Sequence, residues 1–142
     1  GLLFRFPILH IDRPSRGELM RGFFENVAFA MRGNAEQVAR VSGAVPIAVH
    51  VSGGMTRSEA LVRVVADTLG RQVVVSTVTE TASLGSAMLA ATALGWYPDL
   101  NAAVDAMTRL RPVEPDATQF AGLDARYAQW RDGFAAIGGL SI

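Results

Sequence analysis

The sequence contains no cysteine and, among its thirteen basic residues, no lysine. Without cysteine the chain has no disulfide framework, no thiolate nucleophile and no cysteine-ligated metal, and a reduced, cytoplasmic setting is expected. Without lysine it has neither the amine of a Schiff base nor the lysine of a Walker A phosphate loop. The two histidines, His10 and His50, are too few for a histidine-rich site, so we assign no metal ligands.

Net charge and long apolar runs are also absent. Thirteen basic residues balance thirteen acidic ones, so no long-range field attracts nucleic acid or an anionic membrane. The apolar start, Gly1 to Phe4, is interrupted by Arg5 and is far shorter than the roughly 20 apolar residues that span a bilayer. We therefore expect no nucleic-acid partner, no membrane partner and no targeting segment.

What remains is the composition of one globular domain. The 142 residues are 50% hydrophobic and 18% charged, which predicts a single packed domain over residues 1–142. The chain begins at Gly1, within an apolar run, which suggests a piece of a longer protein.

Hydrophobic spacing predicts alternating strands and helices. Helices are expected over residues 16–41, 57–69, 79 or 81 to 91, 101–110 and 121–137, strands over 1–11, 47–51 and 72–78, and a spacer over 112–115. Ser15 should cap a long, well-buried first helix that ends at Gly43, and Gly70 should end the second. The last helix should carry one apolar face made of Leu123, Tyr127, Trp130 and Phe134. This order is typical of a layered α/β unit with mainly parallel strands. About three strands make a poor free-standing sheet, so further strands or a partner domain should complete it.

A pair of glycines, Gly53 and Gly54, directly follows the expected strand 47–51. In open α/β sheets, ligands bind beyond the carboxyl ends of the strands. Glycine lacks a Cβ, so the pair can let a nucleotide's sugar or phosphates lie against bare backbone, and the next helix start favours negative charge. Ser58, one helical turn later, offers a hydroxyl to a base or ribose. The alternative is that the glycines only make a tight connection between strand and helix.

Four segments around and after this turn occur in a fixed order. They are VHVSGGMTRS at 49–58, VADTLGRQV at 65–73, ETASLGSAMLAA at 80–91 and GWYPDL at 95–100. In order and spacing they resemble the FGGY family of carbohydrate kinases, whose members have a strand ending in a Gly-Gly turn and an Ala-Asp-x-x-Gly-Arg-x-Val segment. Residues 1–4, 12–14 and 25–29 also resemble that family, so the resemblance covers most of the chain.

The resemblance implies a ribonuclease-H-like domain of the actin and hexokinase type, here incomplete. Residues 1–142 would be the C-terminal, nucleotide-binding part of a two-domain kinase that phosphorylates a sugar or polyol, of the pentulose type, with ATP and Mg²⁺. Gly53 and Gly54 would face the phosphates and ribose of ATP, and Ser58 the adenine end. Met55 replaces a usual glycine or alanine and would border the nucleotide pocket.

In that family the catalytic aspartate and most sugar contacts lie earlier in the chain, so no catalytic residue is assigned and the isolated chain is expected to be inactive. Its expected partner is the missing N-terminal domain, and the faces left uncovered predict self-association into a homo-oligomer. Asp67 is expected to pair with Arg63 and Arg71, and Glu80 to support a helix N-terminus.

Two other functions are considered. A non-catalytic nucleotide-binding or interaction module derived from such a kinase is the main alternative. A dinucleotide-dependent oxidoreductase is disfavoured, because Gly53 and Gly54 lack the third glycine of the usual fingerprint.

Overall fold

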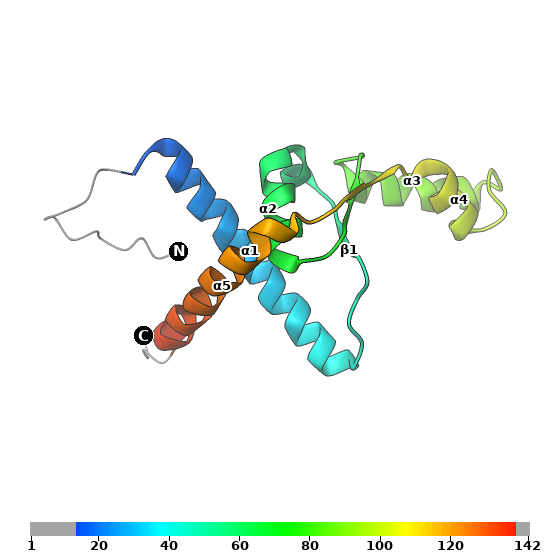
Figure 1. Ribbon diagram of the computed structural model, residues 1–142. Helices are drawn as coiled ribbons and strands as arrows, with labels where there is room; N and C mark the ends of the chain where they lie inside the picture. The colour runs from blue at the N-terminus through cyan, green and yellow to red at the C-terminus, as the bar shows by residue number, and fades with distance from the viewer. Residues whose placement is uncertain (1–13, 139–142) are drawn as a thin grey trace, which may run out of the picture.

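A small sheet with helices against one face forms the centre of the molecule (Figure 1). The structure, a computed structural model, describes residues 14–138, and the strand expected over 1–11 lies outside them. Its elements are α1 (Arg16–Ser42), β1 (Val49–Val51), the short 3₁₀ helix η1 (Gly54–Arg57), α2 (Glu59–Leu69), β2 (Val73–Ser76), α3 (Thr81–Ala93), α4 (Leu100–Met107), β3 (Leu110–Val113) and α5 (Ala117–Gly138).

The sheet has the strand order β1-β2-β3. β1 runs parallel to β2, with Val49 opposite Val73, and β3 runs antiparallel to β2, with Val113 opposite Val73. The spacer expected over 112–115 is therefore wrong, because its first two residues belong to β3. Pro112 is tolerated there, since β3 lies at an edge of the described sheet, where a missing N–H costs no ladder bond.

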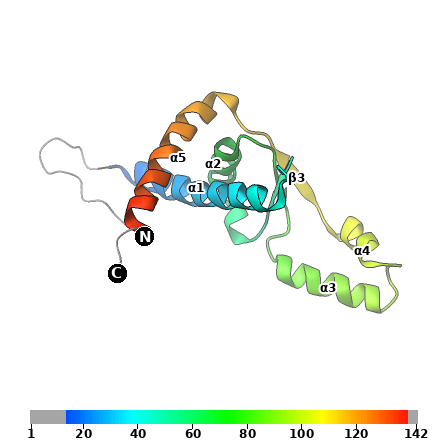
Figure 2. The ribbon, with the colours of Figure 1, turned by 90° about the horizontal axis from the view of Figure 1, so that it is seen from below.

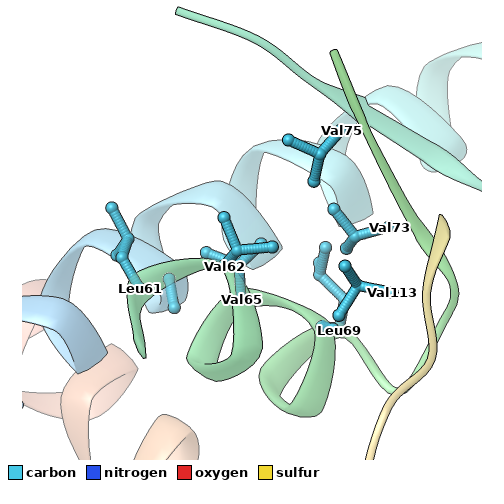
Figure 3. Close-up of a cluster of buried hydrophobic side chains, with 9 residues drawn as sticks. Leu61, Val62, Val65, Leu69, Val73, Val75 and Val113 are labelled. Carbon is cyan, nitrogen blue, oxygen red and sulfur yellow. The ribbon is translucent and has the colours of Figure 1, made fainter. Parts of the chain in front are cut away.

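One face of the sheet carries the core. Alternate strand residues point to this face, and side chains of α2 pack against them (Figure 3). The fully or nearly buried members of the cluster are Ala28, Leu61, Val62, Val65, Ala66, Leu69, Val73, Val75 and Val113. Counted from Leu61, the α2 members lie at positions 1, 2, 5, 6 and 9, which is the spacing of one helical face, so α2 is positioned mainly by burial of valine and leucine side chains.

The other face of the sheet is open within the described residues. His50 and Pro112 are exposed there, and Leu110 is 51% exposed. The expectation of a buried strand at 47–51 is therefore only partly met, because Val49 and Val51 are half-buried and His50 is exposed. His50 thus lies on the open face of the sheet.

The predicted helix ends are confirmed at three positions. Ser15 forms a capping box with Glu18: the Ser15 N–H donates to Glu18 Oε2 at 2.7 Å, and the Glu18 N–H donates to Ser15 Oγ at 3.2 Å. Gly43 and Gly70 end α1 and α2 with left-handed φ values of 69° and 59°. These are local signals that do not depend on the rest of the fold.

The prediction that the first helix is well buried is correct only for its middle. Phe23 near its start and Val41 near its end are 54% and 85% exposed, and its buried residues are Glu25, Ala28 and Phe29. Apolar spacing indicates a face suited to burial, but burial also needs a partner, and α2 and α5 cross α1 at its middle (Figure 1).

The last helix, α5, packs on α1 through aromatic side chains. Leu123 and Tyr127 are 1% and 4% exposed and contact Phe29, which confirms this part of the predicted face. Trp130 is partly buried and Phe134 is 65% exposed, although their rings stack with centroids 5.3 Å apart. The predicted apolar face is thus buried only at its N-terminal end.

Arg32 of α1 links three helices, because its side chain contacts both α2 and α5. Its guanidinium donates to Asp124 Oδ1 of α5 at 2.6 Å, to Glu36 Oε1 at 3.0 Å and to the Thr68 carbonyl of α2 at 3.3 Å. The same group lies 4.3 Å from the ring centroid of Tyr127. The Arg32 side chain is only 16% exposed, whereas those of Glu36 and Asp124 are 39% and 52% exposed, so these contacts are partly shielded from water.

The helices α3 and α4 form an arm away from this body. They pack against each other and lie to one side of α1, α2 and α5 in both views (Figures 1 and 2). Leu89 and Trp96 on the arm are 60% and 73% exposed. The arm therefore contributes little burial to the core described above.

We predict that Arg32→Gln lowers the free energy of unfolding by about 2 kcal/mol, because it leaves Asp124 and Glu36 without their shared cation. Urea unfolding followed by circular dichroism measures this change. The matched control Arg16→Gln, at an exposed position of the same helix, should change stability by no more than about 0.5 kcal/mol. Equal decreases in the free energy of unfolding of the two variants would show that the contacts of Arg32 do not stabilise the packing of these helices.

Burial, together with the hydrogen bond to Glu36 and its negative charge, raises the pKa of Tyr127 above its ordinary value of 10.0. A raised pKa stabilises the fold below the unfolded value and loses this contribution as pH rises through the folded value. We predict that stability falls above about pH 10 and falls less in Tyr127→Phe. Urea unfolding at several alkaline pH values tests this, and identical pH dependence in both proteins would contradict it.

Candidate functional site

The turn after β1 is held in a conformation that requires glycine. Gly53 has φ 98° and ψ 179°, a region that is essentially restricted to glycine. Its carbonyl accepts hydrogen bonds from the Thr56 N–H at 3.1 Å and from Thr56 Oγ1 at 2.7 Å. Thr56 is 7% exposed, so a buried side chain fixes the backbone at the point where η1 begins.

Thr56 was missed by the sequence reasoning, which considered only the glycines, Met55 and Ser58. The available signal was a hydroxyl three residues after Gly53, a spacing at which threonine can bond back to the backbone and fix a turn. The structure thus places Gly53, Gly54, Met55 and Ser58 on one continuous turn between β1 and α2.

Ser58 has a structural role in this turn. It is the N-cap of α2, and its Oγ accepts a hydrogen bond from the Leu61 N–H at 3.3 Å. A serine hydroxyl can donate while it accepts, so capping leaves the Ser58 proton free to bond a ligand. Its contact with the adenine end remains a prediction.

An apolar cavity of about 200 Å³ lies beside the turn. It is lined by Val27, Met31, Val51, Ser52, Gly54, Met55, Thr56, Leu61, Val62, Val65 and Val73. A dry cavity of roughly 150 Å³ can hold a benzene ring, so this larger one has room for a small planar ring system. Met55 is 51% exposed and forms part of the cavity wall. A larger hollow of about 950 Å³ between α1 and α5 contains none of the predicted site residues.

The loop after β2 meets the glycine turn through Arg57. The Arg57 Nη2 donates to Thr79 Oγ1 at 3.1 Å and lies 3.6 Å from Glu80 Oε1. Glu80 occupies the N-cap position of α3 but makes no capping hydrogen bond with its side chain. The carboxylate expected to support a helix N-terminus therefore also pairs with the glycine turn. Sequence reasoning did not single out Arg57.

Asp67 connects two helical segments of the fold. Its Oδ1 accepts a hydrogen bond from the Asp116 N–H at 2.7 Å, which ties α2 to the start of α5. The expected ion pairs of Asp67 with Arg63 and Arg71 are not among the salt bridges of the described residues. A backbone partner from a distant segment has taken their place.

Residues 14–138 contain neither a metal-binding cluster nor a helix that could cross a membrane. Their histidine, aspartate and glutamate side chains form no group of three or more that could hold a metal ion. In the same part of the chain, every helix is too short or too polar to cross a membrane.

Known structures show the fold class to which this sheet and turn belong. The xylulose kinase from Rhodospirillum rubrum superposes with a TM-score of 0.72 over 94% of this chain and 26% of its own, at 28% identity. This confirms the predicted class, an incomplete α/β domain of the ribonuclease-H-like, actin and hexokinase type.

Sequence comparison then gives the family. The model of the FGGY family of carbohydrate kinases, C-terminal domain, matches residues 9–94, and the chain belongs to this family. Glycerol kinase from Ectopseudomonas mendocina (strain ymp) is 34% identical over 115 residues, covering 81% of this chain and 23% of that protein. Apulose kinase from Pectobacterium atrosepticum is 32% identical over 125 residues, covering 87% and 25%. The chain thus spans about a quarter of the length of these relatives.

Because only Gly53 has positive φ at the turn, the two glycines should respond differently to alanine. We predict that Gly53→Ala lowers the free energy of unfolding by about 1–3 kcal/mol through backbone strain. Gly54→Ala is the matched control, since a Cβ there meets nothing within 4 Å, and it should cost less than about 1 kcal/mol. Thermal or urea unfolding measures both, and a Gly54→Ala loss as large as that of Gly53→Ala would contradict the geometry.

Proposed function

We propose that this chain supplies the ATP-binding side of a two-domain kinase that phosphorylates a sugar or polyol of the pentulose type. The observation that carries the proposal is the glycine turn at the carboxyl end of β1, fixed by Thr56 beside an apolar cavity. Membership of the FGGY family supports the reaction class. Similarity to a xylulose kinase and an apulose kinase supports a pentulose-type substrate, whereas the glycerol kinase relative supports a polyol.

Each part of the proposed site has a physical role. The backbone of Gly53 and Gly54 lets the phosphates and ribose approach closely, because no Cβ intervenes. The cavity beside Met55 receives the planar adenine, and burial of its ring in an apolar pocket favours binding. The Ser58 hydroxyl, which caps α2, donates to the adenine end.

The chemical step requires groups that we do not assign to the described residues. Transfer of a phosphoryl group to an alcohol needs a base for the hydroxyl proton, charge neutralisation by Mg²⁺ and in-line positioning. The described residues contain no cluster of ligands for Mg²⁺, so we assign no step to the metal. The proposed base and sugar contacts belong to an N-terminal domain, the proposed partner of this chain, and the chain alone should bind ATP without turnover.

Calorimetric titration of the 142-residue chain with ATP, ADP and NADH tests the binding claim. We predict binding of ATP and ADP but not NADH. Gly54→Ala should weaken ATP binding about tenfold, because a methyl group stands where the nucleotide meets the backbone. The matched control Gly133→Ala, on α5 with equally open surroundings, should bind like the unchanged chain. Binding of NADH in place of ATP would overturn the proposal.

A coupled assay with ATP, Mg²⁺ and a pentulose tests whether catalysis requires the N-terminal domain as well as this chain. The chain alone should form no sugar phosphate, and a two-domain version should do so. Turnover by the chain alone would show that the base lies within it. A two-domain version that binds ATP but phosphorylates no sugar or polyol would favour the non-catalytic module.

A further inference from the structure

We infer that Arg57 binds the phosphates of the nucleotide, and that Thr79 and Glu80 position its guanidinium before the phosphates bind. This inference rests on the proposed function. Arg57 is the last residue of η1, three positions after Gly54. Its guanidinium reaches the loop that follows β2 through Thr79 and Glu80. The group thus bridges the segments that follow β1 and β2, two parallel strands whose carboxyl ends meet at the ligand-binding edge of such sheets.

The charge inventory of the chain favours an arginine in this role. A polyphosphate is best bound by cations, and all thirteen basic residues are arginines. Two other arginines lie near this edge of the sheet, but both are engaged elsewhere. Arg111 donates to Glu59 Oε1 at 2.8 Å, and Arg109 donates to the carbonyls of Ala106 and Thr108 at 3.0 Å each. Arg57 is the one on the glycine turn itself.

The present partners of Arg57 are easily exchanged. The side chains of Arg57 and Glu80 are 69% and 76% exposed, and their closest N···O distance is 3.6 Å. An exposed ion pair of this kind contributes little to stability, since water solvates both charges well. Hydrogen bonds from a guanidinium to a phosphate are shorter, bidentate and stronger. Phosphate can therefore displace the Glu80 carboxylate from Arg57 at small cost.

The two partners play different parts. Thr79 is neutral and keeps the guanidinium over the edge of the sheet whether or not phosphate is present. Glu80 neutralises Arg57 in the absence of nucleotide and competes with phosphate for the same donors. It is a positioning residue whose charge opposes binding, so removing that charge should help the nucleotide. A purely structural pair would behave differently, because loss of either member would then do equal harm.

Titration calorimetry with ATP and adenosine, which share base and ribose, separates these roles. Adenosine affinity can be measured by displacement of ATP. We predict that Arg57→Gln weakens ATP binding about tenfold and leaves adenosine binding unchanged. The ATP affinity of Arg57→Lys should lie between those of the unchanged chain and Arg57→Gln, because lysine keeps the charge but loses the bidentate geometry. Glu80→Gln should tighten ATP binding a few-fold. Arg63→Gln, at an exposed position of α2, is the control and should bind like the unchanged chain.

Three results would overturn the inference. They are unchanged ATP affinity in Arg57→Gln, equal loss for ATP and adenosine in that variant, and weakening by Glu80→Gln as large as that by Arg57→Gln. Circular dichroism of each variant should show unchanged unfolding, because the pair is exposed. If the chain without substitutions binds neither ATP nor adenosine, the proposed function itself is overturned. Failure of the Arg57 inference and failure of the proposed function are therefore distinguishable.

Discussion

The contact of α1 and α2 above the valine face of the sheet forms the core that positions β1, α5 and the glycine turn. Ala28 of α1 and Ala66 of α2 are fully buried in the same cluster, and side chains as small as these let two helices approach closely. Val65 and Val73 below them are only 2% and 0% exposed. Because β1 and α2 both pack in this core, the turn between them is fixed at both ends.

Local signals in the sequence predicted the parts of the fold that depend on neighbouring residues alone. Ser15, Gly43 and Gly70 were assigned from helix-end chemistry, which needs no tertiary partner. β3 was missed because Pro112 argued against a strand, whereas pairing with β2 determines it. The exposure of both ends of α1 was missed because apolar spacing shows which face is suited to burial but not whether another element covers it.

The candidate site was predictable to a similar extent. Gly53 and Gly54 could be singled out because glycine at the end of a strand has a direct conformational meaning. The capping role of Ser58 was not recognised, although its position before α2 indicates it. Arg57 and Glu80 lie 23 positions apart in the sequence and meet only because β1 and β2 are parallel neighbours. Such a contact depends on the fold, and no local pattern predicts it.

These features lead to one central claim, that a rigid turn next to an apolar cavity binds ATP. Nuclear magnetic resonance of the ¹⁵N-labelled chain, titrated with ATP, tests it at single-residue resolution. The account predicts that the largest amide shifts occur at Gly53, Gly54 and Met55, with smaller shifts at residues 77–80. Shifts concentrated in the groove between α1 and α5, or no shifts at the turn, would contradict it.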